Sequence, residues 1–142
     1  MDQIDCTVDI DVCDVVANTV PTETETEIVD WKVMADGSRT WRKKGGNVFT
    51  VVGPDGTQRW YKNWSLHRDD DLPAIIHADG SLEWRKNSVK HRDGDKPAEV
   101  RADGAQFWYQ NGWLHRGKDK PAVILADGEQ KWYQFGKCFR AG

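Results

Sequence analysis

Apolar and polar residues alternate along most of this chain in short runs that end at turn residues. In residues 98–108, the alternation places Ala98, Val100 and Trp108 on one side of an extended backbone, because side chains alternate across a strand. Two turn sequences bound these runs, Asp103-Gly104 and Asn111-Gly112, and both are typical of β-hairpins. The pattern therefore predicts antiparallel hairpins joined by tight turns.

The same pattern recurs every 24 residues, with a tryptophan at each of positions 60, 84, 108 and 132. An Asp-Gly pair precedes each tryptophan by four or five residues, and a His-Arg pair follows the first three by seven or eight. A period of this length is typical of a repeat array, in which each unit buries its apolar face against its neighbours. We therefore predict an all-β antiparallel meander of stacked β-hairpin repeats.

Each turn also fixes which residues face each other across a hairpin. The Asp-Gly turn pairs Val100 with Gln106, and the Asn-Gly turn pairs Tyr109 with Leu114. Residue types on the tryptophan face are similar in every repeat, whereas those on the opposite face change. The constant face is therefore predicted to form the core, and the variable face is predicted to meet solvent or a partner.

The first 30 residues differ from the repeats in charge and pattern. They hold nine acidic residues and no basic one, whereas residues 31–142 hold 14 acids against 20 bases. Residues 4–12 alternate between apolar and polar types, which favours a strand that caps the repeat sheet or pairs with a partner's sheet. The Thr-Glu repeats of residues 22–27 are typical of a linker. We expect an acidic N-terminal strand and linker over residues 1–30 and a repeat domain over residues 31–142.

Residues 31–142 resemble the MORN repeats and their bacterial and viral variants, which are stacked hairpins of about this length. The resemblance rests on the period, the placement of the aromatic residues and turns such as the one in residues 108–112. The usual repeat has Gly-x-Gly where this chain has the sequence His-Arg-Asp-Gly-Asp-Lys-Pro-Ala (residues 91–98). This sequence is similar to repeats in proteins of phages and large viruses. The resemblance implies a scaffold or binding role rather than a reaction.

Composition narrows the expectations about location and cofactors. The chain has 142 residues, a net charge of −3 and eight tryptophans, so its core is expected to be thin and aromatic. No apolar run is long enough for a membrane-spanning helix, and the N-terminus has no signal-peptide pattern. We therefore expect a cytoplasmic protein, in the host cytoplasm if the chain is viral. The cysteines Cys6, Cys13 and Cys138 form no Cys-x-x-Cys motif, so neither a disulfide framework nor a zinc site is expected.

Three histidines share one repeat position: His67, His91 and His115. The last repeat carries Phe139 there and the truncated first repeat carries Val48, so the position is predicted to pack against the neighbouring indole. A metal or catalytic role is the alternative for these histidines.

Repeated carboxylates and guanidinium groups also invite a catalytic interpretation. We expect them to form a ladder of ion pairs that brace the turns, with aspartates at 71, 95 and 119 and arginines at 68, 92 and 116. A calcium site at positions 9, 11 and 14 would lack the glycine and terminal glutamate of a binding loop. Because no catalytic or cofactor motif is present, we expect no enzyme activity, no cofactor and no metal.

Aromatic residues at variable positions give the clearest indication of function. Trp64 and Trp113 lie in the region of the second turn, where a small residue would suffice, and basic residues lie close by in sequence. Exposed aromatic residues beside basic ones suit a protein interface or base stacking. The predicted partner-binding residues are Trp64, Tyr61, Phe107, Tyr109, Trp113, Arg116, Asp5, Asp9 and Asp11.

Together these features indicate a non-enzymatic binding protein whose partner is another protein. If the resemblance to viral repeats holds, the partner is a host component, such as a nucleic-acid-binding defence complex, and the molecule is an inhibitor or adaptor. The alternative is a module that binds nucleic acid or a nucleotide through the basic, aromatic face, because 20 bases against 14 acids give residues 31–142 a formal charge of +6.

Overall fold

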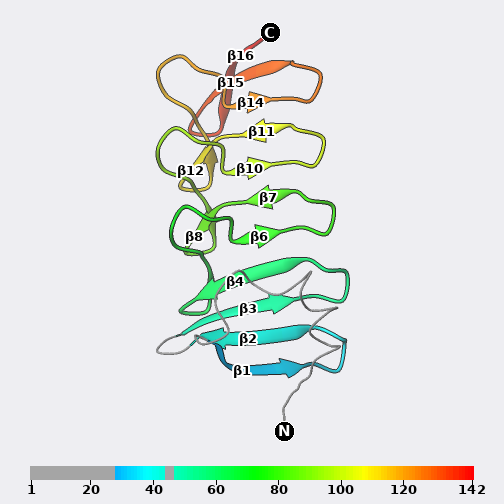
Figure 1. The fold of residues 1–142 in the computed structure, drawn as a ribbon. Helices are drawn as coiled ribbons and strands as arrows, with labels where there is room; N and C mark the ends of the chain where they lie inside the picture. Colours follow the sequence, from blue (N-terminus) through cyan, green and yellow to red (C-terminus); the bar gives the residue numbers. More distant parts are fainter. Residues whose placement is uncertain (1–27, 44–46) are drawn as a thin grey trace, which may run out of the picture.

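The computed structural model describes residues 28–43 and 47–142, so the predicted capping strand and most of the predicted linker lie outside the described residues. Within these two segments the chain forms strands, turns and loops and no helix, and hence no helix that could span a membrane. Figure 1 shows the hairpins stacked one above another from β1 to β16. The all-β hairpin array that the sequence predicts is confirmed.

Most strands of the described chain are only two residues long. Their bounds are β1 (Ile28–Val33), β2 (Arg39–Lys43), β3 (Val48–Val52), β4 (Gln58–Lys62), β5 (Ser65–Leu66), β6 (Ile75–Ile76), β7 (Leu82–Glu83), β8 (Arg85–Lys86), β9 (Val89–Lys90), β10 (Glu99–Val100), β11 (Gln106–Phe107), β12 (Tyr109–Gln110), β13 (Trp113–Leu114), β14 (Val123–Ile124), β15 (Gln130–Gln134) and β16 (Lys137–Ala141).

One sheet of 12 strands runs the length of the stack, in the order β1-β2-β3-β4-β6-β7-β10-β11-β14-β15-β16, with β5 beside β4. Two further pairs, β8–β9 and β12–β13, form small separate sheets. All pairings are antiparallel, as expected when consecutive strands are joined by short turns.

The first four strands differ from those that follow. Strands β2, β3 and β4 pair over four or five consecutive residues, whereas β6, β7, β10, β11 and β14 pair over two. We call β1–β4 the meander and β5–β16 the repeat array. The difference follows from the sequence, because the meander lacks the seven-residue segments 67–73, 91–97 and 115–121 that interrupt the later strands. We call these segments the return loops.

The Asp-Gly turns close the long hairpins on the side of the stack opposite the return loops (Figure 1). In the turn at Asp103, the N–H of Gly104 donates to the carbonyl of Arg101 at 2.9 Å, and the N–H of Arg101 donates to Ala105 at 2.9 Å. The carboxylate of Asp103 accepts the N–H of Ala105, and Gly104 has a φ of 93°. This is a type I turn with a glycine bulge, and the predicted register, Val100 opposite Gln106, is confirmed.

A shorter hairpin follows each tryptophan of the 24-residue repeat, at positions 60, 84, 108 and 132, and we call these the side hairpins. Their two turn residues all have φ between 48° and 85°, as in a type I′ turn, at positions 63–64, 87–88, 111–112 and 135–136. The predicted pairing of Tyr109 with Leu114 is confirmed. Successive side hairpins are joined by backbone hydrogen bonds, such as the one from Gly112 to Lys90 at 2.9 Å.

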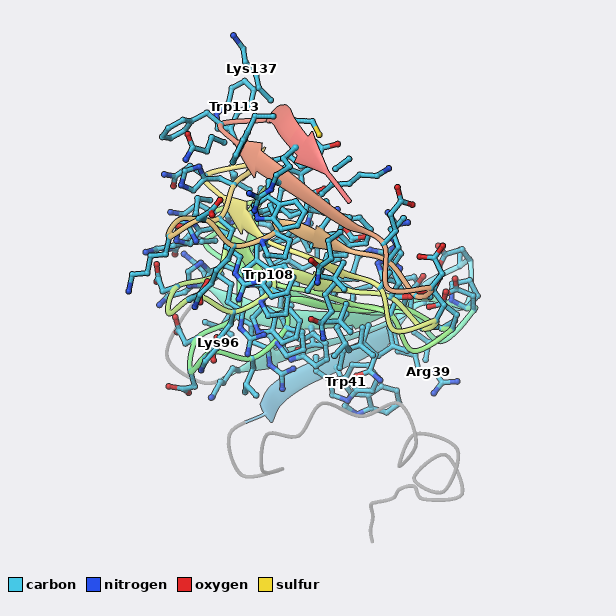
Figure 2. All side chains as sticks on the ribbon, turned by 90° about the horizontal axis from the view of Figure 1, so that it is seen from above. Arg39, Trp41, Lys96, Trp108, Trp113 and Lys137 are labelled. Atoms are coloured by element: carbon cyan, nitrogen blue, oxygen red, sulfur yellow. The ribbon has the colours of Figure 1, made fainter. Side chains whose placement is uncertain are left out.

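Trp60, Trp84 and Trp108 form the core of the stack, as predicted, whereas Trp132 in the last repeat is only half-buried. Trp60, Trp84 and Trp108 are 2%, 8% and 5% exposed, and the view along the stack in Figure 2 places Trp108 near its centre. Trp41 is buried in the same way in the meander. Large rings therefore supply the apolar burial that the two-residue strands cannot provide.

The variable face is not left to solvent, and this part of the prediction is wrong. Phe107 and Glu99, both on that face, are 8% and 7% exposed. Phe107 clusters with Ala105 and Val123. The guanidinium of Arg101 lies 4.2 Å from the centre of the Phe107 ring. Long side chains of neighbouring strands thus cover positions that sequence alternation alone assigns to the surface.

Candidate partner-binding surface

Each return loop holds an aspartate that joins two repeats. The carbonyl of Asp95 accepts the indole N–H of Trp108 at 3.2 Å. Its carboxylate accepts Nε of Arg116 at 2.8 Å and Nζ of Lys120 at 2.9 Å. Asp95 has a φ of 56°, so a left-handed backbone presents both groups to the next repeat. We call this set of contacts the clamp.

The previous repeat forms the same clamp around Asp71. Its carbonyl accepts the indole N–H of Trp84 at 2.9 Å, and its carboxylate accepts Nε of Arg92 and Nζ of Lys96, both at 2.8 Å. These hydrogen bonds from cations hold the pKa of Asp71 well below its usual range and lower the pKa of Asp95 to about 2. The carboxylates of the clamp are therefore ionised at neutral pH.

Arginine, not histidine, stacks on the indoles. The guanidinium of Arg116 lies 3.9 Å from the Trp108 ring and donates to the carbonyl of Pro121 at 3.0 Å. The predicted ladder of ion pairs is present, but each pair joins neighbouring repeats, so Arg116 pairs with Asp95 and Arg140 pairs with Asp119. The side chain of Arg116 is only 14% exposed, which corrects the expectation that it belongs to an open binding surface.

The repeated histidines join the side hairpins. Nδ1 of His91 accepts the N–H of Asn111 at 3.0 Å, while Nε2 lies 2.8 Å from a carboxylate oxygen of Asp93. His67 and His115 accept the N–H groups of Asn87 and Phe135 in the same way, each at 3.3 Å. These contacts give the recurring histidine a structural role between successive side hairpins. No group of metal-binding side chains comes together in the described parts of the chain.

Four large apolar side chains stand exposed where the side hairpins turn. Trp64, Val89, Trp113 and Phe135 are 77%, 41%, 58% and 68% exposed. Figure 2 shows Trp113 at the margin of the stack, far from the central Trp108. We call these four residues the apolar edge.

The turn glycines bring members of the apolar edge into a row. A Cβ atom added at Gly112 would lie 2.9 Å from Cγ1 of Val89, and one at Gly136 would lie 2.6 Å from the Trp113 ring. Val89 and Trp113 therefore each rest on the turn of the next repeat. Because the side hairpins stack in this way, Val89 and Trp113 lie in a row along the array. Trp64 and Phe135 lie in the side hairpins before and after them.

Trp64 is the most unusual member of the apolar edge. It has a φ of 66° at the turn position where the later repeats carry Ser88, Gly112 and Gly136. A bulky residue in the left-handed region is disfavoured, and such conformations often mark functional positions. Its ring lies 5.1 Å from that of Phe49, which is the only packing of Trp64 against an aromatic ring found in the described residues.

The other predicted binding residues have mixed locations. Tyr61 is half-buried and stacks on Phe49 with ring centres 4.9 Å apart, so Tyr61 and Trp64 share one neighbour. Tyr109 is also half-buried, and burial raises its pKa. Phe107 is in the core, as described above. The acidic residues Asp5, Asp9 and Asp11 lie outside the described residues.

Sequence reasoning identified Trp64 and Trp113 but missed Val89 as part of the apolar edge. Val89 lies 24 residues before Trp113, so it occupies the same repeat position. Alignment of this single position across the repeats would have revealed the match.

Basic groups on the variable face are largely occupied by buried carboxylates. Glu99 accepts hydrogen bonds from Lys90 and from Nε of Arg101, the latter at 2.8 Å. Glu83 accepts from Arg85 at 2.6 Å. Burial alone would raise the pKa of these glutamates, but the hydrogen bonds outweigh it and the pKa of each lies below its usual value. The face is therefore less available to an external anion than its sequence suggests.

Two open clefts lie between successive return loops. The first has a volume of about 420 Å³ and lies between residues 67–72 and 91–96, with Trp84 and strand β8 in its wall. The second has a volume of about 320 Å³ and lies one repeat further along, against Trp108. Their equivalent positions allow the two to be compared residue by residue.

Comparison with known proteins adds one finding. No family model matches this chain. A stretch of 23 residues, 16% of the chain, is 74% identical to part of an uncharacterized protein of Acanthamoeba polyphaga mimivirus. The match covers 6% of that protein, and its length is close to one repeat. The chain is thus similar, over about one unit, to a protein of a large virus.

Proposed function

We propose that this chain is a non-enzymatic binding protein that holds a protein partner along the apolar edge. The proposal rests on one observation: large apolar side chains occupy turn tips in successive repeats and stay exposed. Aromatic residues in such positions carry much of the binding energy at protein interfaces. A stacked array also presents them at a regular spacing, which suits an extended segment of the partner.

A double substitution tests this function. Trp64→Ser with Trp113→Ser introduces the residues that other repeats carry at these positions, Ser88 and Ser65, so the fold is expected to be kept. We expect the amount of partner captured from a lysate of the cells in which the protein naturally occurs to fall by about tenfold or more, since aromatic anchors typically contribute about 2 kcal/mol or more. Met34→Ser is the matched control, because Met34 is 49% exposed and lies at the Asp36-Gly37 turn, away from the side hairpins. Unchanged capture by the double variant would contradict the proposal.

The acidic residues Asp5, Asp9 and Asp11 extend this proposal to a partner with a basic surface patch. A triple Asp→Asn variant should associate more slowly and show a flatter salt dependence, because charge steers encounter more than it sets the lifetime of a complex. Surface plasmon resonance against the captured partner at two salt concentrations measures both quantities. Equal association rates for wild type and variant would remove the acidic stripe from the interface.

Nucleic-acid binding is the alternative function, and it makes the opposite prediction. If the basic residues of the array bind phosphates, neutralising the acidic segment should strengthen binding and keep it salt-sensitive. The ion pairs of Glu83 and Glu99 argue against this function, because they already neutralise nearby bases. Filter binding of single- and double-stranded DNA to the full chain and to the triple variant decides between the two.

We also propose that the repeats are variants of the MORN repeat and that the chain is an inhibitor or adaptor of viral origin, acting in the host cytoplasm on a complex that binds nucleic acid. The period, the hairpin turns and the similarity to a mimivirus protein support this proposal. A crystal structure that follows the path of a MORN array through two successive units would support the kinship, and a different path would refute it.

A further inference from the structure

We infer that the first cleft, between the return loops 67–73 and 91–97, binds an acidic segment of the protein partner. This inference rests on the proposed function and adds the chemistry of the partner. Five basic side chains line the cleft against two carboxylates, Asp71 and Asp93, which gives a formal charge of +3 with histidines neutral. The bases are Arg68, Arg85, Lys86, Arg92 and Lys96.

The second cleft allows a comparison, because its wall strand carries different residues. It is lined by Arg116 and Lys118 against Asp93 and Asp95, so its formal charge is zero. Part of the difference comes from the wall strand, where β8 carries two bases and the equivalent β12 carries Tyr109 and Gln110. The wall strand is therefore basic in the first cleft and neutral in the second, while the return loops of both clefts carry further bases, among them Lys118 and Lys120 in the second.

The lysines, rather than the arginines, are available to a ligand. Arg92 donates to Asp71 and to the carbonyl of Pro97, and Arg85 is similarly occupied by Glu83 and Ser88. Lys86 is exposed and forms no hydrogen bond or ion pair within residues 28–43 and 47–142.

The side chain of Lys96 is 53% exposed, and within the described residues it donates one hydrogen bond, to Asp71. Each ammonium group is a compact donor that can bind one carboxylate, and because Arg85 and Arg92 are already engaged, neither offers a phosphate a free guanidinium fork. The chemistry of the cleft thus favours aspartate or glutamate side chains.

The cleft also opens beside the proposed interface. Lys86 lies directly opposite Val89 in the side hairpin β8–β9, and Val89 belongs to the apolar edge. Leu72, 42% exposed, adds an apolar group to the cleft lining. A segment that packs on the apolar edge would therefore bring its neighbouring side chains to Lys86 and Lys96. A partner segment with acidic side chains next to apolar ones would therefore match both the cleft and the apolar edge.

The test uses hexaglutamate peptide as the probe and the full ¹⁵N-labelled chain. The indole N–H of Trp84 bonds to Asp71 in the first cleft, and that of Trp108 bonds to Asp95 in the second, so each NMR signal reports one cleft. We expect saturable movement of the Trp84 signal that decreases with salt, and no movement of the Trp108 signal. Equal movement of both signals, or none, would overturn the inference.

Two variants with the same charge change sharpen the test. Lys86→Gln introduces the residue found at position 110, and should weaken the peptide about threefold, as expected for one exposed ion pair. Lys118→Gln, in the second cleft, should leave its affinity unchanged. An equal effect of both variants would mean that the peptide responds to net charge alone and would overturn the assignment.

Two further arms identify the occupant. If inorganic pyrophosphate displaces the peptide at a tenfold lower concentration, the site is one for phosphates and the inference is wrong. If the Asp5, Asp9 and Asp11 triple Asn variant moves the Trp84 signal without peptide, the cleft is filled by this chain itself and not by a partner. Hexaglutamate has no apolar groups, so it does not report on the apolar edge. The peptide can fail to bind while the partner still binds the apolar edge, and it can bind while the partner does not.

Discussion

The meander and the repeat array reach the same stacked architecture by different means. In the meander, strands β2–β4 pair over four or five residues, and the backbone ladder itself joins one strand to the next. In the array, the strands between β6 and β14 pair over two residues, and side chains of the clamp complete the connection. Each return loop thus replaces backbone pairs with an aspartate, an arginine and a tryptophan from adjoining repeats.

This difference in how strands are joined explains why the same residues recur in each repeat of the array. Backbone hydrogen bonds tolerate most side chains, whereas the clamp needs particular groups at particular positions. The meander accordingly carries Val48 where the array carries histidine, and it lacks the return loops that hold the aspartates. Single substitutions should therefore damage the array more than the meander.

The largest expected effect is at the core tryptophans. Trp84→Ala should lower the free energy of unfolding by about 3–5 kcal/mol, as for other large core truncations. The loss should exceed that of Trp41→Ala, because only Trp84 also supports Arg92, whose guanidinium lies 3.8 Å from its ring. Urea unfolding measures both. A larger loss at Trp41 would show that the clamp adds little to the array.

Glycine substitutions at turns compare stacked with unstacked hairpins. Gly56→Ala in the meander and Gly112→Ala in the array both force alanine into positive φ, at about 1 kcal/mol each. Nothing lies within 4 Å of the new methyl at Gly56, whereas Val89 lies 2.9 Å from it at Gly112. Gly112→Ala should therefore cost about 1 kcal/mol more. Equal melting temperatures would mean that the side hairpins do not stack closely in solution.

His91→Phe tests the link between side hairpins. The variant should fold and keep its partner, because Phe139 occupies this repeat position in the last unit. It should lose about 1 kcal/mol, since the N–H of Asn111 loses its acceptor. Amide hydrogen exchange at Asn111 should accelerate while that in β2–β4 is unchanged. Loss of the partner with the fold intact would place His91 in the interface.

The smallest expected effect is that of Asp95→Asn, which removes the charge of the carboxylate and keeps the shape of the side chain. At neutral pH the loss should be below about 1 kcal/mol, because this ion pair is partly exposed to solvent.

The pH dependence is the sharper readout for this variant. Folding lowers the pKa of Asp95 from 3.8 to about 2, so its contribution is present above pH 4 and is lost as the pH falls toward 2. The variant should therefore lose less stability than wild type over that window. Identical acid profiles would show that the pair contributes nothing in solution.

Much of the fold followed from local sequence. The Asp103-Gly104 and Asn111-Gly112 turns and their registers were predicted correctly, because a turn depends on the conformational preferences of three to five adjacent residues. The candidate surface was predicted in part. Trp64 and Trp113 are exposed as expected, whereas Phe107 and Arg116 are buried or held in a clamp.

The amino-acid sequence by itself determined the period and the hairpins, since each depends on residues close together in the chain, and it indicated the face that carries Trp60, Trp84 and Trp108. Only the tertiary structure decided that Arg116 pairs with Asp95 rather than with Asp119, and that Arg101 covers Phe107. The physical reason is that a repeat specifies its own turns but not the offset at which the next repeat stacks on it. That offset sets which side chains meet, and hence which basic groups stay available in the first cleft.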